Sequence, residues 1–239
     1  MEQTFECKTV VVTGAASGIG HAQVQAFLQR GAHVVGVDVA KTNISQERYT
    51  HILASVANKE AIEVALRDVN VDILCNTAGV LDGYATTLQT DEQLWNRVFD
   101  VNVKGMYIVT NAVLPNMLKR KSGIIINMAS IAGMIAGGGG AAYTASKHAV
   151  IGYTKQLSYD YCKEGIRVNG IAPGAIQTPM NAADFEGDGA MAKWVAEQTP
   201  AGRWASPDEV ASVTLFLASD ASDYMHATII PLDGGWMNK

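Results

Sequence analysis

The chain has 239 residues, of which 48% are hydrophobic and 17% charged, and its formal net charge is −5. This length and balance are typical of one large globular domain and exclude disordered and fibrous chains. The negative charge argues against a nucleic-acid surface, and no apolar run is long enough to span a membrane. The acidic start does not resemble a secretory signal, and the scattered cysteines and histidines form no metal motif. We therefore expect a cytoplasmic protein with free thiols, no bound metal, and neither nucleic-acid nor membrane partners.

Short runs of β-branched and other apolar residues predict the strands of a sheet. They lie at Thr9–Thr13, His33–Val37, a weaker run near Ile52, Val71–Cys75, Gly123–Met128, Ile166–Ile171 and Thr228–Leu232. The segments between them predict helices from the first glycines through Arg30 and at Lys59–Asp68, Asp91–Leu118, Tyr143–Lys163 and Pro207–Ser219. Strands that are apolar nearly throughout and alternate with helices are typical of a parallel sheet covered on both faces. The sequence therefore predicts an α/β fold, a doubly wound parallel sheet in three α/β/α layers, as a single domain over residues 1–239.

A glycine-rich turn, Thr13-Gly-Ala-Ala-Ser-Gly-Ile-Gly20, follows the first strand. Glycines at a strand-to-helix turn let the backbone approach a ligand closely, and the helix start offers free N–H groups to a pyrophosphate. The spacing of Gly14, Gly18 and Gly20 differs from the commoner Gly-x-Gly-x-x-Gly, but its place after the first strand is the one that a dinucleotide site requires. The turn therefore predicts a dinucleotide-binding site.

The second strand ends at Asp38. A carboxylate at this place can accept hydrogen bonds from an adenosine ribose, and it repels a 2′-phosphate. Asp38 therefore favours NAD(H) and disfavours NADP(H). The alternatives are an aspartate that only starts a turn, and a nearby cation, Lys41, that swings in and admits NADP(H).

A tyrosine and a lysine lie four residues apart in the helix expected at Tyr143–Lys163. At this spacing Tyr143 and Lys147 share one helix face. The ordinary pKa of a tyrosine, near ~10, is too high for efficient acid–base work at neutral pH, and a neighbouring cation favours the phenolate. The two residues are therefore either an acid–base group with a lowered pKa or a surface pair without a function.

Motifs along essentially the whole chain resemble the short-chain dehydrogenase/reductase family, in particular its members similar to 3-oxoacyl-[acyl-carrier-protein] reductases. They are the glycine turn, Asn76-Thr-Ala-Gly79, Val101-Asn-Val-Lys-Gly105, Ser130, Tyr143-x-x-x-Lys147, Ala172-Pro-Gly-Ala-Ile-Gln-Thr-Pro179 and Asp233-Gly-Gly. The resemblance implies a Rossmann fold and an oxidoreductase that moves a hydride between nicotinamide and a carbonyl or secondary alcohol. It also implies a homotetramer whose subunits pair through the segments Asp91–Leu118 and Tyr143–Lys163.

The resemblance further implies four catalytic residues. Tyr143 is the general acid or base, and Ser130 holds the substrate oxygen in line with the hydride. Lys147 bonds the nicotinamide ribose and lowers the pKa of Tyr143, and Asn102 holds a water that links Lys147 to solvent. Asn102 could also kink its helix by bonding to the backbone of that helix, and the two roles are compatible. The residues expected to bind the cofactor are Gly14, Ser17, Gly18, Ile19, Gly20, Asp38, Ser55, Val56, Asn76, Ala78, Gly79, Tyr143, Lys147, Pro173, Gly174, Ile176 and Thr178.

Two departures from the family pattern bear on the cofactor. Ser55 stands where many members carry an aspartate, and it follows Asp38 closely. We expect the helix between these two residues to be reduced or absent, with adenine recognition by Ser55 and backbone groups. Ser17 stands where members that reduce 3-oxoacyl groups with NADPH tend to carry an arginine, so Ser17 and Asp38 weaken that assignment.

The segment of residues 180–198 is expected to form a substrate lid. Its apolar residues suit a hydrophobic or mixed substrate, or they only pack the lid against the body: Met180, Phe185, Met191, Trp194 and Val195. The acids Asp184, Glu186 and Asp188 argue against a multiply anionic substrate. The four glycines Gly137–Gly140 should lie beside the pocket and leave either room or mobility there. The substrate could be a 3-oxoacyl thioester, a small diketone, a polyol or sugar, or a cyclic alcohol, and a non-catalytic nucleotide sensor is the remaining alternative.

Overall fold

The computed structural model describes residues 4–239. Residues 1–3 lie outside the described residues. They belong to the acidic start, for which we expect no secretory signal. The strands form one parallel sheet in the order β3-β2-β1-β4-β5-β6-β7. They are β1 Thr9–Thr13, β2 His33–Asp38, β3 Tyr49–Leu53, β4 Ile73–Asn76, β5 Gly123–Met128, β6 Ile166–Pro173 and β7 Ile229–Leu232. Every predicted strand is confirmed within a few residues, including the weaker run near Ile52.

The helices are α1 Gly18–Leu28, α2 Lys59–Leu66, α3 Glu92–Phe99, α4 Met106–Arg120, α5 Ala141–Tyr161, α6 Ala190–Gln198 and α7 Pro207–Leu217. The single helix predicted over Asp91–Leu118 is wrong in one respect, because a π-helix at Asp100–Gly105 separates α3 from α4. No helix lies between β2 and β3 in the described chain, as expected. Helix α6 was predicted only as part of a lid. Within residues 4–239 no helix is long and apolar enough to cross a membrane.

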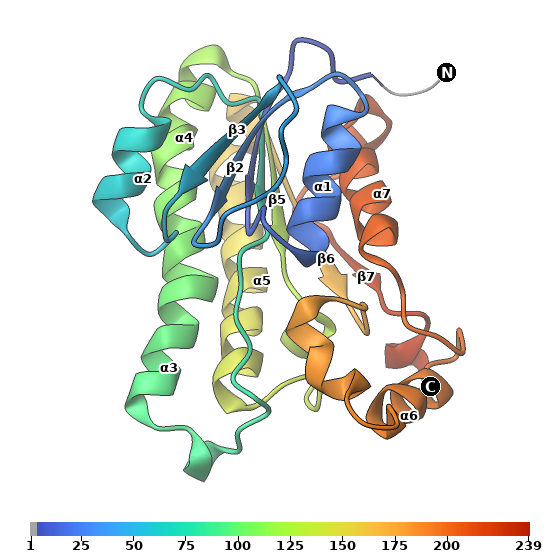
Figure 1. Ribbon diagram of the computed structural model, residues 1–239. Coiled ribbons are helices and arrows are strands. Elements are labelled where there is room, and N and C mark those ends of the chain that lie inside the picture. Colours follow the sequence, from blue (N-terminus) through green and yellow to red (C-terminus); the bar gives the residue numbers. More distant parts are fainter. Residues whose placement is uncertain (1–3) are drawn as a thin grey trace.

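The sheet separates two layers of helices, so that the doubly wound architecture is confirmed (Figure 1). Helices α1 and α7 pack together on one face, and α2, α4 and α5 cover the other. Side chains of a strand alternate between the faces, and β1 shows this most clearly. Val10 and Val12 join the core beneath α1 and α7, whereas Val11 joins the core on the opposite face.

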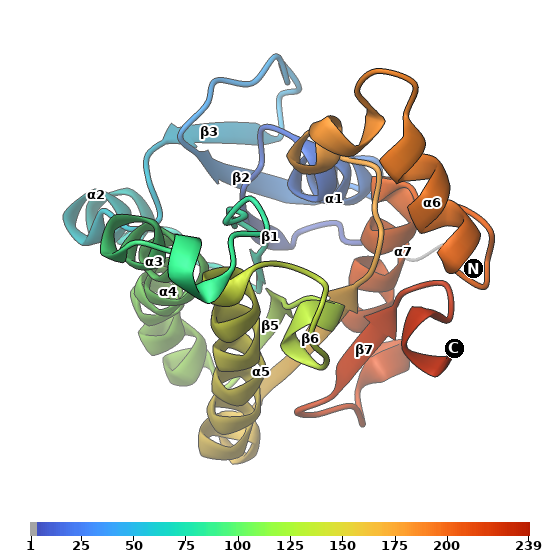
Figure 2. The ribbon, with the colours of Figure 1, turned by 90° about the horizontal axis from the view of Figure 1, so that it is seen from below.

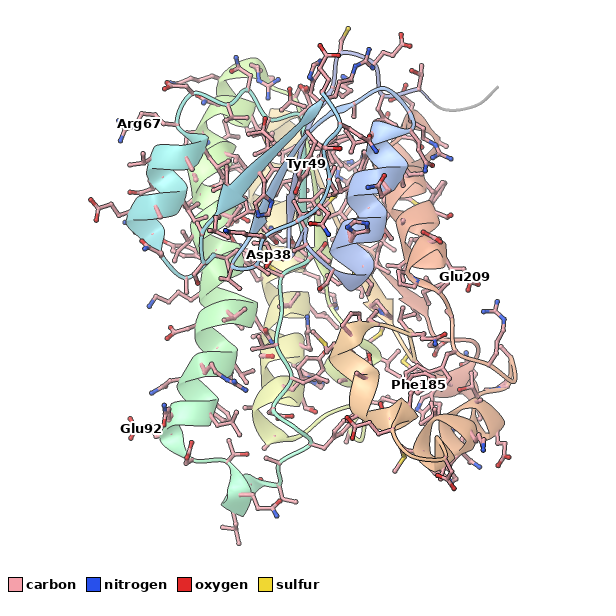
Figure 3. All side chains as sticks on the ribbon, viewed as in Figure 1. Asp38, Tyr49, Arg67, Glu92, Phe185 and Glu209 are labelled. Atoms are coloured by element: carbon pink, nitrogen blue, oxygen red, sulfur yellow. The ribbon has the colours of Figure 1, made fainter. Side chains whose placement is uncertain are left out.

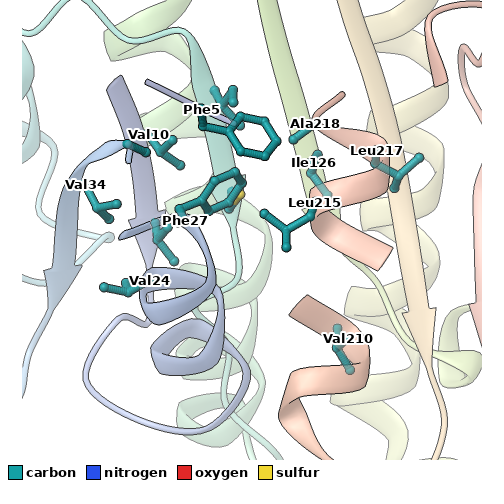
Figure 4. Close-up of a cluster of buried hydrophobic side chains, with 14 of the residues drawn as sticks. Phe5, Val10, Val24, Phe27, Val34, Ile126, Val210, Leu215, Leu217 and Ala218 are labelled. Atoms are coloured by element: carbon teal, nitrogen blue, oxygen red, sulfur yellow. The ribbon is translucent and has the colours of Figure 1, made fainter. Parts of the chain in front are cut away.

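Phe27 of α1 is a centre of the first of these cores (Figure 4). Its ring is fully buried and meets the ring of Phe5 edge-on, with 5.1 Å between the ring centroids. Leu215 of α7 belongs to the same cluster. Truncating such a side chain to alanine lowers the free energy of unfolding by about 3–5 kcal/mol, so this contact holds α1 and the glycine turn before it against the sheet.

The strand order reverses between β1 and β4, and ligands of open parallel sheets bind outside the carboxyl ends of the strands at such a point. Figure 1 places α6 and the C-terminus at one end of the molecule, opposite the N-terminus. Figure 2 looks onto this end, where the loops that follow the strands gather. The fold thus brings the glycine turn, the loops after β4, β5 and β6, and the segment 180–198 to one edge.

Candidate active site

A pocket of about 750 Å³ opens at this edge. Most of the residues expected to act or to bind a cofactor line it together: Gly14, Ser17, Gly18, Ile19, Gly20, Asp38, Ser55, Val56, Ala78, Gly79, Ser130, Tyr143, Lys147, Pro173, Gly174, Ile176 and Thr178. Two expected residues, Asn76 and Asn102, do not line it. The pocket therefore joins the two predicted sites, one for a cofactor and one for chemistry, into one space.

The glycine turn has the close backbone approach that a dinucleotide needs. Gly14 and Gly18 have φ angles of +70° and +53°, which favour glycine. A Cβ atom on Gly20 would collide with the carbonyl oxygen of Gly14, and one on Gly14 would lie 3.0 Å from the Cα atom of Ala78. Ser17 at the start of α1 makes no side-chain capping bond, so the first N–H groups of this helix remain available to an anion.

Asp38 lies at the lower end of β2 in Figure 3 and faces the glycine turn. Its Oδ2 atom accepts a hydrogen bond from the N–H of Ala16 at 3.0 Å, and Oδ1 accepts one from the N–H of Ala40 at 2.8 Å. Asp38 therefore does start a turn, and it also lines the pocket. Burial, followed by the charge of Asp38, raises the pKa of Tyr49 to about 12. The glycine turn, the helix start and this carboxylate together fit a dinucleotide.

Ser130, Tyr143 and Lys147 all line the pocket, and all three are buried. The Nζ atom of Lys147 lies 5.5 Å from the centroid of the Tyr143 ring and donates a hydrogen bond to the carbonyl oxygen of Met128 at 2.8 Å. The Ser130 hydroxyl accepts a bond from the N–H of Ala132 at 3.1 Å and donates one to the carbonyl oxygen of Pro173 at 3.5 Å. A carbonyl compound in the pocket could therefore reach the hydroxyl groups of both Ser130 and Tyr143.

The expected lowering of the Tyr143 pKa by Lys147 is not what the structure gives. Burial raises the pKa of Tyr143 to about 12, against a lowering contribution from the Ser130 hydroxyl. Burial likewise lowers the pKa of Lys147 to about 8. The ammonium group is directed to the Met128 carbonyl, and the loss of solvent around the phenol dominates. Tyr143 therefore keeps its proton at neutral pH.

Asn102 lies in the π-helix one layer behind the pocket wall. Its Oδ1 atom accepts a bond from the N–H of Val80 at 2.8 Å, and its Nδ2 atom donates to the Val80 carbonyl at 3.0 Å and to the Ser146 hydroxyl at 3.1 Å. The interpretation that Asn102 bonds its own helix is wrong, because the loop after β4 supplies both backbone partners. A Cβ atom on Gly79 would lie 3.4 Å from Oδ1 of Asn102 and 3.7 Å from Nζ of Lys147. Asn102 thus supports the loop that separates it from the pocket.

Asn76, an expected cofactor-binding residue, belongs to a polar network behind the pocket. It is buried, and its Nδ2 atom donates to the hydroxyl of Thr110 at 3.0 Å and to Oδ1 of Asn127 at 2.9 Å. Asn127 in turn donates to the hydroxyl of Thr154 at 3.0 Å. This polar network ties β4 and β5 to α4 and α5, so Asn76 fixes the helices behind the site.

The glycines before α5 are explained by close packing more than by empty room. A Cβ atom on Gly139 would collide with the Tyr143 ring, and one on Gly140 would lie 2.5 Å from Oδ2 of Asp82. Gly137 has a φ angle of +90° and open space around it, and it lines the pocket. Of these three, Gly137 leaves open space, Gly139 lets the loop touch the Tyr143 ring, and Gly140 lets the start of α5 approach Asp82.

The substrate side of the pocket is largely aromatic. Trp194 of α6 meets Trp236 near the C-terminus at 6.5 Å between ring centroids, and Trp204 lines the same space. Phe185 packs against Trp204 at 4.9 Å and does not line the pocket, so part of the apolar set in the segment 180–198 only packs this segment in place. Sequence reasoning missed Tyr84, Asn181, Trp204 and Trp236. Only Trp236 had a signal, because it directly follows Asp233-Gly-Gly.

The comparisons with known proteins agree with this geometry. A family model described as enoyl-(acyl carrier protein) reductase matches residues 14–237. Dehydrogenase/reductase SDR family member 6 of Rattus norvegicus is 37% identical over 243 residues, which cover 97% of this chain and 98% of that protein. The 3-oxoacyl-[acyl-carrier-protein] reductase FabG of Thermotoga maritima is 36% identical over 245 residues, covering 97% of this chain and 98% of that protein.

A solved structure is similar to this chain in its three-dimensional fold. It is described as an NAD(P)-dependent gluconate 5-dehydrogenase of Beutenbergia cavernae with bound NADP at low occupancy. It superposes on this chain with a TM-score of 0.93 at 32% identity, and the match covers 99% of both chains. The chain is therefore an oxidoreductase that belongs to the short-chain dehydrogenase/reductase family, whose members use nicotinamide cofactors.

Proposed function

We propose that this protein is an NAD(H)-dependent oxidoreductase that interconverts a carbonyl and a secondary alcohol, with Tyr143 as general acid and base. The observation that carries the proposal is the convergence of Ser130, Tyr143 and Lys147 in the pocket that also holds the glycine turn and Asp38. A non-catalytic nucleotide sensor would need the glycine turn but would not need these three side chains around one buried point.

A bound nicotinamide would supply or accept the hydride. Tyr143 gives its proton to the carbonyl oxygen during reduction, and its raised pKa of about 12 keeps that proton in place at neutral pH. Ser130 donates a hydrogen bond to the same oxygen and stabilises its developing charge.

Lys147 and Asn102 act behind Tyr143. The pKa of Lys147, lowered to about 8 by burial, leaves this side chain able to exchange a proton near neutral pH. It would bond the nicotinamide ribose once it leaves the Met128 carbonyl. Asn102 holds the backbone of Val80 between itself and the pocket. Its role as holder of a water for proton resupply stays a prediction.

NAD(H) is favoured over NADP(H) because Asp38 faces the ribose end of the pocket with a negative charge. Ser17 offers no cation against a 2′-phosphate. The similar Beutenbergia cavernae protein holds NADP at low occupancy, so the family likeness by itself does not decide the cofactor. The proposal of NAD(H) rests on the charge of Asp38.

An uncharged substrate fits the pocket best. Among the described lining residues only Asp38, Lys147 and Asp184 carry a charge, and Asp184 is the one on the side of the segment 180–198. A negative charge beside aromatic walls favours a small diketone, a sugar or a cyclic ketone over an anionic substrate. A 3-oxoacyl thioester stays a second candidate, supported by the similarity to the Thermotoga maritima reductase.

We further propose a cytoplasmic homotetramer. Tyr107 of α4 and Tyr159 of α5 are 54% and 81% exposed, which suits two helices that pair with a second copy. The three cysteines are free thiols, as a reducing compartment requires.

The test of the proposed function is oxidation of NADH by the purified protein with a panel of carbonyl compounds. Small diketones, sugars, cyclic ketones and a 3-oxoacyl thioester are compared at equal concentration, with the Tyr143→Phe variant as the matched control. Turnover of at least one compound by the wild type and none by the variant is expected. No turnover of any compound would contradict the proposal.

A further inference from the structure

The turn Asp82–Ala85, between β4 and α3, holds an aromatic residue in an unfavourable backbone conformation. Gly83 and Tyr84 have φ angles of +65° and +59°, and the N–H of Ala85 lies 3.4 Å from the carbonyl oxygen of Asp82. Two central residues with positive φ define a type I′ turn, which glycine adopts freely and a tyrosine rarely does. Residues held in such strain cluster at functional sites.

Asp82 holds this turn against the start of α5. Asp82 is 4% exposed, and its Oδ1 atom accepts bonds from the N–H of Gly140 at 2.9 Å and of Tyr84 at 3.2 Å. Its Oδ2 atom accepts a bond from the N–H of Tyr143 at 2.9 Å. Gly140 is the N-cap residue of α5 and has no side chain that could cap the helix. Asp82 therefore supplies the capping oxygen from another segment.

A second contact joins the same two segments. The N–H of Ala141 donates to the carbonyl oxygen of Ala85 at 3.0 Å. A Cβ atom on Gly140 would lie 2.5 Å from that oxygen and from Oδ2 of Asp82, so only glycine permits this approach. The positions of Tyr84 and Tyr143 are therefore set by one cluster of hydrogen bonds.

Tyr84 lines the same pocket as Tyr143 and Asp184 of the segment 180–198. It is 51% exposed. Burial and then the charges of Asp184 and Asp82 raise the pKa of Tyr84, and Tyr84 in turn contributes to the raised pKa of Tyr143. Tyr84 therefore shares this pocket with the proposed general acid, Tyr143, and with Asp184.

We propose that Tyr84 contacts the substrate beyond its reacting carbonyl, and that Asp82 is the positioning residue that keeps Tyr84 and Tyr143 at a fixed separation. Tyr84 would recognise an uncharged part of the substrate, which packs on its ring and forms one hydrogen bond with its hydroxyl. The inference rests on the proposed function, because Tyr143 is the proton donor there. The strain at Tyr84 is kept because it aims this side chain at the substrate.

The Tyr84→Gly variant tests the first part. Glycine relieves the backbone strain, so Tm is expected to stay or rise while kcat/KM for the best ketone falls at least about tenfold. Lys121→Gly is the matched control, because Lys121 also has a positive φ, +50°, and lies at the far end of α4. It should leave kcat/KM within about twofold of wild type. A Tyr84→Gly variant with wild-type kcat/KM would overturn the assignment.

The Asp82→Asn variant tests the second part, with Asp91→Asn as its control. Asp91 caps α3 through the N–H of Leu94 at 2.7 Å, so it has the same capping chemistry away from the pocket. We expect kcat of Asp82→Asn to fall at least about tenfold while the Kd for NADH changes less than about threefold. Asp91→Asn should change neither. An unchanged kcat in Asp82→Asn would overturn the positioning role, and an inactive Tyr143→Phe in the same assays would leave the proposed function standing.

Discussion

The carboxylate of Asp38 accepts a hydrogen bond from the N–H of Ala16 at 3.0 Å, so the end of β2 and the glycine turn hold each other in place. The negative charge is thereby fixed at the place where an adenosine ribose would lie. A 2′-phosphate would meet this charge without a cation from the glycine turn, where Ser17 stands. Asp38 is therefore both a structural link and the expected selector of the cofactor.

We predict a preference for NADH over NADPH of at least about a hundredfold in kcat/KM, which corresponds to ~2.7 kcal/mol. The Asp38→Ser variant should lose most of this preference, because it binds NADH more weakly and admits NADPH. Steady-state rates on one ketone with both cofactors measure the effect. Equal efficiency of the wild-type protein with the two cofactors would show that Asp38 does not select between them.

The buried Lys147 predicts a pH-dependent stability. Burial lowers its pKa from 10.5 to about 8, so the unfolded chain binds more protons than the folded chain between these two values. The contribution of Lys147 to stability therefore rises as pH rises through this window, and below it the buried charge costs about 3 kcal/mol. Lys147→Met should remove that cost at pH 7 and have less effect near pH 10.

Chemical denaturation of both proteins at pH 7 and pH 9.5 measures this difference. Comparing the two proteins isolates Lys147, because other buried groups, such as Cys75, whose pKa is raised by burial, are common to both. A free energy of unfolding that Lys147→Met lowers at pH 7, or changes equally at both pH values, would contradict the prediction.

Assembly gives a separate prediction. Light scattering at micromolar concentration should return four times the 25.4 kDa of the chain. Introducing a charge at Tyr159, which is 81% exposed on α5, should shift the mass towards smaller species without changing the fold measured by circular dichroism. A wild-type protein of monomer mass would refute the expected pairing of helices.

Much of the fold could be predicted because its signals are local. The β-branched runs, the glycine turn and Asp38 at the end of β2 are each visible within a few residues. The break between α3 and α4 was not, because Asn102 there takes its partners from Val80, 22 residues earlier in the chain. Asp82 was missed for the same reason. It accepts a hydrogen bond from the N–H of Tyr143, which lies 61 residues later in the chain.

The properties of the candidate site also divide into those that local sequence predicts and those that depend on distant contacts. The spacing of Tyr143 and Lys147 predicted that they share a helix face, and both line the pocket. The direction of the Tyr143 pKa depends on how much solvent surrounds the phenol and on where the ammonium group points, and neither can be read from spacing. The cofactor role of Asn76 stays a prediction from its motif, and the sequence does not reveal that its Nδ2 group bonds Thr110 and Asn127 inside the protein.

The most direct test of the central claim is the Tyr143→Phe variant in a single-turnover experiment. Hydride transfer from NADH to the best ketone of the panel is followed at 340 nm, and NADH binding is titrated separately by fluorescence. Phenylalanine keeps the ring packed on Gly139 but removes the proton, so hydride transfer should fall by more than about a thousandfold while the Kd for NADH stays within about threefold of wild type. Hydride transfer that survives within about tenfold of wild type would show that another group supplies the proton.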